Sequence, residues 1–89
     1  MTEITTGIAV TVRFFAAARD AAGADTRTLT LPAGATVADA IAELCGQSDE
    51  LALVLRKCSF LCDSVAVRDR DTVLRARQTL DVLPPFAGG

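Results

Sequence analysis

The eight residues IAVTVRFF, from Ile8 to Phe15, place an apolar side chain at every second position. One parity holds Ile8, Val10, Val12 and Phe14, and the other holds Ala9, Thr11, Arg13 and Phe15. Successive side chains of a β-strand point to opposite faces of a sheet, so this period of two predicts a strand with one buried face. The fold therefore begins near Ile8, and the first parity faces the core.

The segment after this strand predicts a short helical turn and a second strand. Residues 16–22 are rich in alanine, and Gly23 follows as a stop signal. Between Thr26 and Leu31, leucine and threonine alternate, which is again typical of a strand. We expect the two strands to form an N-terminal hairpin with a wide connection.

The main helix is predicted to follow Pro32-Ala33-Gly34, which breaks the second strand. Thr36 stands three residues before Asp39, a near capping box ahead of an apolar run. The apolar residues recur at helical spacing on one face: Val37, Ala40, Ile41, Leu44 and Cys45. Gly46 marks the approximate end of this helix.

The rest of the chain predicts a shorter helical turn at Asp49–Leu55 and three short strands. Residues 59–62 and 65–67 are two strands, or one interrupted strand, separated by a turn at Asp63-Ser64. Residues 80–83 form the closing strand, which Pro84-Pro85 terminates because proline has no backbone N–H.

These elements together predict an α+β fold, the ubiquitin-like β-grasp. A single amphipathic helix needs a sheet to bury its apolar stripe, so we expect a mixed sheet with the main helix packed on one face. The first and last strands should lie side by side at the centre, with a protruding C-terminal tail. The predicted domain covers residues 8–83, and residues 84–89 form the tail.

Composition restricts the class of function. Eighty-nine residues build one small core but no deep enzyme cleft. The net charge of −2 has no stripe of one sign, which argues against nucleic acid or an anionic membrane as a partner. No apolar run approaches the ~20 residues of a membrane span, and the start does not resemble a signal peptide. We therefore expect a cytoplasmic protein that acts with protein partners.

The three cysteines are Cys45, Cys58 and Cys62, and the sequence has no histidine. Their spacing lacks the paired C-x-x-C units of a structural zinc site, so we expect no metal. We expect them to be small buried hydrophobic residues. Without His, Trp or Tyr, candidates for a general base or a stacking platform are few, which favours a carrier over a catalyst.

The last seven residues carry the strongest functional signal. They are Leu83, Pro84, Pro85, Phe86, Ala87, Gly88 and Gly89, and none of them is polar. The two glycines lack Cβ atoms, so this backbone can pass through a channel too narrow for side chains. Six residues beyond Leu83 span at most roughly 20 Å, at about 3.3 Å each. We expect the Gly89 carboxylate to enter the active site of a partner.

Three stretches resemble the MoaD/ThiS family of sulfur carriers. They are residues 13–19 (RFFAAAR), residues 35–39 (ATVAD) and residues 83–89 (LPPFAGG). The resemblance covers roughly residues 8–89, and within the family it is strongest to the molybdopterin synthase branch. Cys62 stands where the family often has Asn, and residues 75–79 replace a usual Gly-Asp turn. Both departures affect turns rather than the tail.

The resemblance implies that the Gly89 carboxylate is adenylated by an ATP-dependent activating enzyme. A sulfur donor then displaces AMP and leaves a covalent thiocarboxylate. This sulfur is delivered inside the large synthase subunit, where two transfers build the dithiolene of molybdopterin. On this chain the resemblance implies that the reaction takes place at Gly89. Gly88, Ala87 and Phe86 are the tail residues that pass into the partner. No bound cofactor is implied.

Two other functions stay open. One is a carrier for a different sulfur product, such as thiazole or a thiolated amino acid. The other is a β-grasp domain that mediates binding and never carries sulfur. A mass measurement after activation separates carriers from binding modules, and the identity of the co-purifying large subunit separates the two kinds of carrier.

A docking patch is predicted on the face of the sheet that the helix leaves open. Phe15 has the outward parity of the first strand, and Leu83 has the outward parity of the last. Val65 could complete the group. We expect Phe15, Val65 and Leu83 to contact both the activating enzyme and the large subunit, with Phe86 following the tail inside. In the alternative, Phe15 folds over the edge of the sheet.

Overall fold

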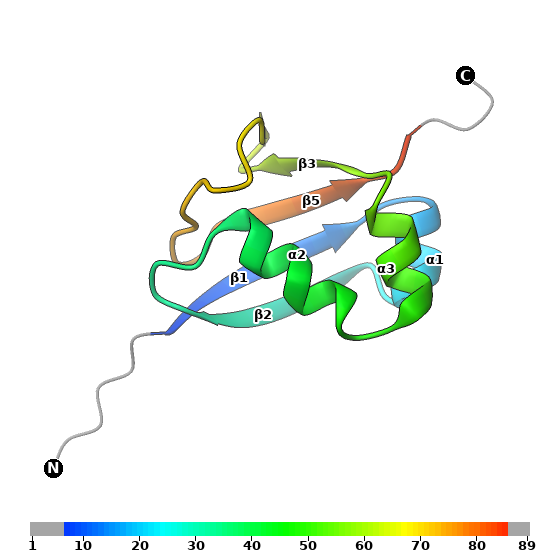
Figure 1. Cartoon of the computed structure of the whole chain (residues 1–89), viewed down its shortest axis with the longest axis horizontal. Coiled ribbons are helices and arrows are strands. Elements are labelled where there is room, and N and C mark those ends of the chain that lie inside the picture. The colour runs from blue at the N-terminus through cyan, green and yellow to red at the C-terminus, as the bar shows by residue number, and fades with distance from the viewer. Residues whose placement is uncertain (1–6, 86–89) are drawn as a thin grey trace, which may run out of the picture.

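The computed structural model describes residues 7–85, which form five strands and three helices (Figure 1). In chain order these are β1 (Gly7–Phe14), α1 (Ala17–Ala22), β2 (Thr26–Pro32), α2 (Val37–Cys45), α3 (Asp49–Leu55), β3 (Ser59–Cys62), β4 (Val65–Ala66) and β5 (Thr79–Leu83). The predicted order of elements is confirmed, and the predicted boundaries differ by one residue at several strand ends.

The five strands form one mixed sheet in the order β2-β1-β5-β3-β4. β1 and β5 are parallel neighbours at its centre, and the other pairs are antiparallel. The prediction that the first and last strands lie side by side is therefore confirmed. The helices lie on one face and at one end of the sheet, as Figure 1 shows. This is the predicted α+β, ubiquitin-like β-grasp arrangement.

The core lies between the sheet and α2. On β1 the buried side chains are Val10, Val12 and Phe14, which is the predicted inward parity. From α2 the core takes Val37, Ala40, Ile41 and Leu44. We call this side of the sheet the covered face: it holds Val10, Val12, Phe14, Phe60, Leu80 and Val82.

The start of α2 is fixed by the capping box. The Thr36 hydroxyl accepts the Asp39 N–H at 3.2 Å, and the Asp39 carboxylate accepts the Thr36 N–H at 2.9 Å. These bonds satisfy two N–H groups that have no partner inside the helix, so they set the first turn of α2. The long connection after β4 is tied to the same place, because Thr36 pairs with Val73 and Leu74 is buried beside it.

β1 ends at Phe14, one residue earlier than the sequence predicts, because the chain turns sharply at Ala16. Ala16 has φ 51° and ψ −127°, and the Ala18 N–H donates to the Phe15 carbonyl at 3.0 Å. This turn leads into α1, which ends at Gly23 in a left-handed conformation with φ 74°. The prediction that Gly23 ends this helix is therefore confirmed.

Candidate functional site

The predicted tail is attached to a central strand of the sheet. Leu83, the last residue of β5, pairs with Ser59 of β3 and is half-buried. Pro84 and Pro85 follow, and β5 ends before them. Phe86, Ala87, Gly88 and Gly89 lie outside the described residues, so their predicted roles stay predictions.

The face opposite the helices is the open face, and the register assigns its side chains. Paired residues of neighbouring strands point to the same side of a sheet. The open face therefore holds Ala9, Thr11, Arg13, Thr26, Thr28, Thr30, Ser59, Leu61, Ala66, Thr79, Asp81 and Leu83. Threonines occupy its β2 side, and apolar residues gather on its β3–β4 side. Arg13 and Asp81 lie between the two halves.

Phe15 lies at the margin of this face, directly after β1. Its side chain is 38% exposed, and its backbone N–H donates to the Val82 carbonyl at 3.2 Å. The Arg13 guanidinium carbon lies 5.5 Å from the centroid of the Phe15 ring, a distance typical of a cation–π contact. Phe15 is therefore accessible beside the end of β5, and its role in binding a partner stays a prediction.

Val65 does not belong to the same face as Leu83, so this part of the prediction is wrong. Val65 pairs with Cys62, and Cys62 pairs with Leu80 of the covered face. Val65 is 68% exposed because it lies on the edge strand β4, with the parity of the covered face. The open-face residue of β4 is Ala66, which pairs with Leu61. A docking patch on this face would therefore use Leu61 and Ala66 instead of Val65.

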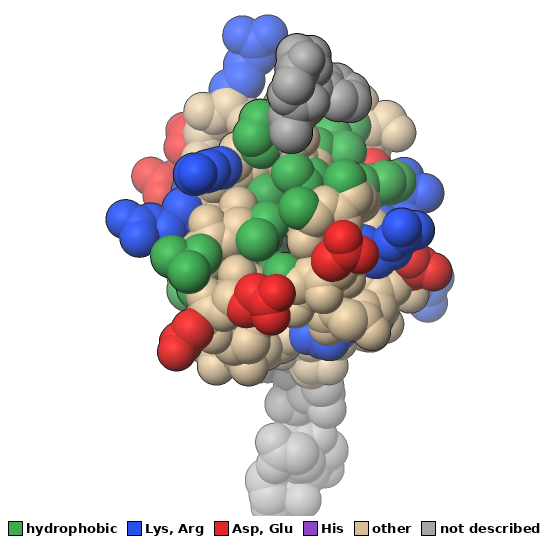
Figure 2. Space-filling model, turned by 90° about the vertical axis from the view of Figure 1, so that its right-hand side faces the viewer, with side chains coloured by type: hydrophobic (Ala, Val, Ile, Leu, Met, Phe, Trp, Pro, Cys, Tyr) green, Lys and Arg blue, Asp and Glu red, His purple; other side chains and the backbone are tan. Residues whose placement is uncertain are grey.

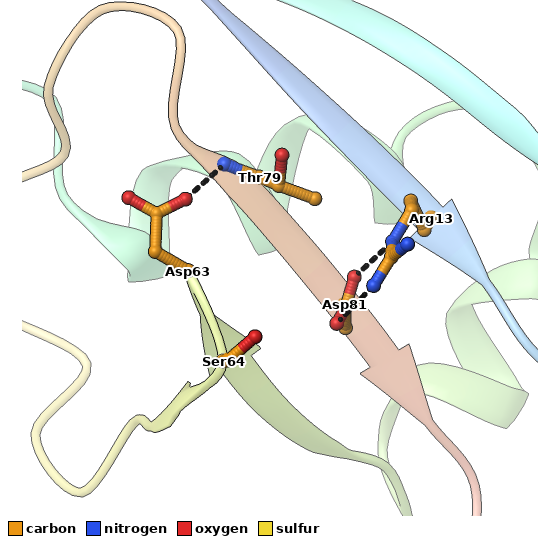
Figure 3. A pocket seen from close by; sticks show the side chains of 5 residues that line it. All are labelled: Arg13, Asp63, Ser64, Thr79 and Asp81. Carbon is orange, nitrogen blue, oxygen red and sulfur yellow. Dashed lines mark hydrogen bonds and ion pairs between the residues drawn. The ribbon is translucent and has the colours of Figure 1, made fainter.

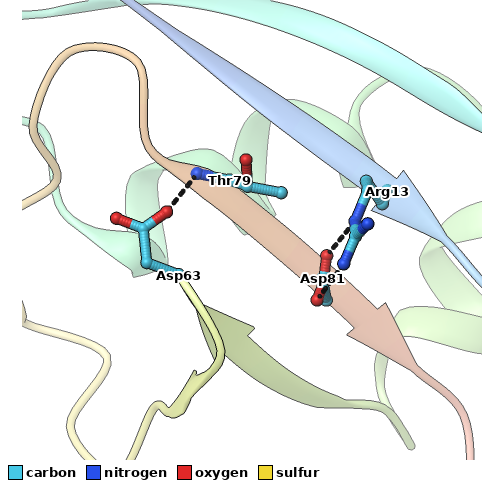
Figure 4. Close-up of polar contacts among 4 residues, drawn as sticks. All are labelled: Arg13, Asp63, Thr79 and Asp81. Carbon is cyan, nitrogen blue, oxygen red and sulfur yellow. Dashed lines mark hydrogen bonds and ion pairs between the residues drawn. The ribbon is translucent and has the colours of Figure 1, made fainter.

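An ion pair that is not among the features predicted from the sequence lies at the centre of the open face. Arg13 Nε donates to Asp81 Oδ1 at 2.6 Å, and Arg13 Nη2 donates to Asp81 Oδ2 at 2.9 Å (Figure 4). The Asp81 side chain is only 6% exposed, whereas that of Arg13 is 49% exposed. The hydrogen bond to Asp81, and then the charge of Asp81, raise the pKa of Arg13.

The tight turn between β3 and β4 is tied to the start of β5 by Asp63. Asp63 and Ser64 both have positive φ, 48° and 72°, as the two central residues of a type I′ hairpin turn require. Asp63 Oδ1 accepts the Thr79 N–H at 2.9 Å, and Oδ2 accepts from Gln78 Nε2 at 3.2 Å. The Asp63 carboxylate thus takes the place of the backbone hydrogen bonds that would join β3 and β5 beyond the end of β3.

A shallow hollow of about 340 Å³ lies on the open face between this turn and the ion pair. Its lining residues are Arg13, Asp63, Ser64, Thr79 and Asp81, as Figure 3 shows. All five are polar or charged, and their side chains come from β1, β5 and the turn. The hollow therefore offers hydrogen-bonding groups to a side chain that enters from outside.

Hydrophobic side chains also gather at the end of the molecule formed by α1 and α3, bordered by acidic and basic groups (Figure 2). The two helices contact each other there. α3 carries Leu53, which is 61% exposed, and α1 carries the exposed Ala17. This surface lies at the end of the sheet where β5 terminates, so it borders the attachment of the tail (Figure 1).

The prediction that all three cysteines are buried is confirmed only in part. Cys58 is buried, whereas Cys45 and Cys62 are half-buried against the core. Burial raises the pKa of the Cys58 thiol, and burial followed by the charges of Asp63 and Asp81 raises that of Cys62. These two thiols are therefore protonated at neutral pH and are poor nucleophiles.

Residues 7–85 contain no group of three or more His, Cys, Asp or Glu side chains placed to hold a metal ion. Over the same residues, no helix has the length and apolar character needed to cross a membrane.

The model of the ThiS family matches residues 12–89, which is most of the chain. The chain belongs to the ThiS family. This match includes β5 and the whole Pro-Pro-Phe-Ala-Gly-Gly sequence that follows it. The predicted membership of the MoaD/ThiS group is confirmed.

A curated relative is the molybdopterin synthase sulfur carrier subunit of Chlamydomonas reinhardtii. It is 30% identical over 81 residues, which are 90% of this chain and 98% of the relative. The homology therefore extends over the whole domain and is not limited to the glycine motif.

Solved structures share the fold. The HVO 2177 protein of Haloferax volcanii has a TM-score of 0.85 at 25% identity, covering 100% of this chain and 93% of that chain. SAMP1 of the same organism has a TM-score of 0.81 at 25% identity, covering 91% and 99%. A chain from the complex of subunits 1 and 2 of the Helicobacter pylori molybdopterin-converting factor has a TM-score of 0.67 at 22% identity, covering 92% and 100%.

Proposed function

We propose that this chain is the sulfur-carrying small subunit of a molybdopterin synthase and acts in the cytoplasm. The observation that supports this function best is that β5, a central strand, leads directly into the Pro-Pro-Phe-Ala-Gly-Gly sequence of a ThiS family member. The relative with 30% identity is named as the carrier subunit of that synthase. The domain thus holds a narrow tail and presents its last carboxylate to partners.

Activation of that carboxylate requires a second enzyme. A carboxylate is a poor electrophile, so the Gly89 oxygen attacks ATP on the activating enzyme, which forms an acyl adenylate and releases pyrophosphate. The sulfur atom of a donor then attacks the carbonyl carbon, and AMP leaves. With a persulfide donor the product of this attack is an acyl disulfide, and a thiol then cleaves its S–S bond. The thiol and the remaining donor sulfur become a disulfide, and Gly89 keeps a C-terminal thiocarboxylate.

The thiocarboxylate then supplies sulfur inside the large subunit of the synthase. Each transfer moves one sulfur atom to the pterin precursor and returns Gly89 to a carboxylate, so two transfers are needed for one dithiolene. Residues 7–85 contain no histidine, and the two thiols with raised pKa are poor nucleophiles. Acid–base groups for both steps therefore come from the partners, and this chain contributes docking and delivery.

The first experiment measures the intact mass of the chain after incubation with an activating enzyme, ATP and a sulfur donor. Replacement of one oxygen by sulfur is expected in the unchanged chain. A chain that lacks Gly89 should fold normally and give no product in a reconstituted synthase, because the buried core of the described residues ends at Val82. Product formation by this truncated chain would contradict the proposal.

Gly88→Val is the matched tail variant. A β-branched side chain widens and stiffens the backbone at this position, so the sulfur transfer should be blocked. The thermal stability should equal that of the unchanged chain, which separates an effect on passage from an effect on folding. Full activity of this variant would show that the tail passes no narrow channel.

A carrier for another sulfur product is the second candidate, because the matching family model is described by the name ThiS. The two candidates differ in the partner that accepts sulfur. Reconstitution with the large subunit of molybdopterin synthase should give dithiolene product under the first proposal. Thiocarboxylate formation without dithiolene product would favour the second.

A further inference from the structure

The centre of the open face has an unusual arrangement of charge. Asp81 is 5% exposed although no helix covers this side of the sheet. Arg13 lies beside it in the parallel register and binds both carboxylate oxygens. Among the open-face residues of the five strands, Arg13 and Asp81 alone are charged. The pair is neutral as a whole, and the group that it exposes to solvent is the Arg13 guanidinium.

Arg13 keeps unused hydrogen-bond donors. A guanidinium has five N–H groups. Within this ion pair, Nε and Nη2 each donate one bond to Asp81. The remaining N–H groups of a side chain that is 49% exposed face water in the free protein. Because the two bonds and the Phe15 ring hold the guanidinium in place, its outer donors are already oriented for a partner.

The hollow beside Arg13 offers acceptors at its other end. Asp63 is exposed, and each of its oxygens accepts one bond from the chain, which leaves a further lone pair on each. The Ser64 and Thr79 hydroxyls line the same space, which measures about 340 Å³. A group entering the hollow thus meets donors on the Arg13 side and acceptors on the Asp63 side (Figure 3).

We propose that the large subunit docks on the open face and inserts one neutral hydrogen-bonding side chain, the carboxamide of an Asn or Gln, into this hollow. The inference rests on the proposed function, because it names the chemistry of that same partner. The carboxamide oxygen accepts from Arg13, and its NH₂ group donates toward Asp63 or the hydroxyls. Leu61, Ala66 and Leu83 provide the apolar contact beside it.

Charged side chains fit the hollow less well than a carboxamide. An inserted carboxylate adds a third negative group to a site that already holds Asp63 and Asp81 against one guanidinium. An inserted ammonium or guanidinium can pair with Asp63, but it offers no acceptor to the outer N–H groups of Arg13 and lies beside that like charge. Repulsion of like charges raises the cost of both arrangements when water is excluded.

A purely apolar partner surface is also disfavoured. Docking removes water from the outer N–H groups of Arg13, and an apolar surface supplies no acceptor for them. Leaving such donors unsatisfied at a dry interface is costly. The ion pair would therefore discriminate between large subunits, and Arg13 would be a specificity-determining residue outside the tail.

The test measures binding of the large subunit of molybdopterin synthase from the source organism to the full-length chain and its variants. In the principal variant, Arg13→Leu and Asp81→Leu are combined, so no charge is left unpaired on the face. The thermal unfolding midpoint should stay close to that of the unchanged chain. The Kd should rise by about tenfold or more, the scale of a lost hot spot.

Two further variants complete the set. Arg13→Lys keeps the charge beside Asp81 but loses the planar fork, so the Kd should rise several-fold even if the double variant does not fold. Glu43→Gln changes an exposed side chain of α2, which packs on the other face of the sheet, and should leave the Kd unchanged. The salt dependence of the Kd should be the same for the unchanged chain and for the double variant, because the inserted group is neutral and the replaced pair has no net charge.

Equal binding by the unchanged chain and by a folded double variant, or by Arg13→Lys, would overturn the inference while leaving the proposed function intact. A steep salt dependence that disappears in the double variant would show a charged partner group and would overturn it as well. Absence of binding by the unchanged chain would overturn the proposed function and this inference with it.

Discussion

The two faces of β1 and β5 differ in what determines their residues. On the covered face, Val12 and Leu80 are fully buried neighbours, and their identity follows from packing against α2. One position further along each strand, Arg13 and Asp81 are neighbours on the open face. The same backbone thus carries an apolar core on one side and a solvent-facing ion pair on the other. The covered face accounts for the fold, and the open face is the surface on which we propose that the large subunit docks.

The largest effect should come from the covered face. Leu80→Ala removes a fully buried side chain at the centre of the sheet and should lower the free energy of unfolding by about 3 kcal/mol. Leu83→Ala on the open face of the same strand should cost only about 1 kcal/mol, because Leu83 is half-buried. Denaturant unfolding of both variants measures the difference, and equal losses would break the distinction between the faces.

An intermediate effect is expected from Phe15 at the margin of the open face. Phe15→Ser should weaken binding of the large subunit by about 2 kcal/mol, the scale of an interface hot spot. Thermal stability should change little, since the ring is 38% exposed. Titration calorimetry with the large subunit and thermal unfolding of the free chain give the two quantities. A large loss of stability at unchanged affinity would assign Phe15 to the core.

The smallest effect should come from Ala16, where the chain leaves β1. Its φ of 51° and ψ of −127° are typical of the second residue of a type II′ turn, which favours glycine. Ala16→Gly should therefore raise the free energy of unfolding by about 0.5 kcal/mol, because the strain at Cβ exceeds the added entropy of the unfolded chain. Ala17→Gly in α1 is the control and should lower it. A loss of stability in Ala16→Gly would contradict this account.

Much of the fold could be predicted from the sequence because local signals and burial agree. The alternation in β1 and the Thr36–Asp39 capping box both gave the correct element, and the helix stripe gave the correct covered face. The strand boundaries follow less directly from the sequence. Parity alone could not show that β1 stops at Phe14, since the turn at Ala16 uses a backbone conformation that alanine rarely adopts.

The face of Val65 could not be predicted in the same way. Strand parity is known only within one strand, and the turn fixes how it continues into the next. The two-residue turn at Asp63-Ser64 places Val65 opposite Cys62, so it takes the parity of the covered face. A sequence with Asn-Gly at this turn would have signalled the register, whereas Asp-Ser gives a weaker indication.

The sequence does contain a signal for the Arg13–Asp81 pair. Each residue interrupts an apolar strand at an outward position, and the two strands were expected to be neighbours at the centre of the sheet. Opposite charges on adjacent central strands favour a cross-strand pair. The register between β1 and β5 could not be predicted from the sequence. The bidentate contact and the hollow beside it depend on that register.

The position of β5 also has a mechanical consequence. Hydrogen bonds join β5 to β1 on one edge and to β3 on the other. A pull applied beyond Leu83 along the strand axis loads both ladders in shear, so many bonds must break together. An edge strand pulled away sideways would instead lose its bonds one after another. A partner that draws on the chain at Pro84 therefore transmits tension to the whole sheet without unravelling it.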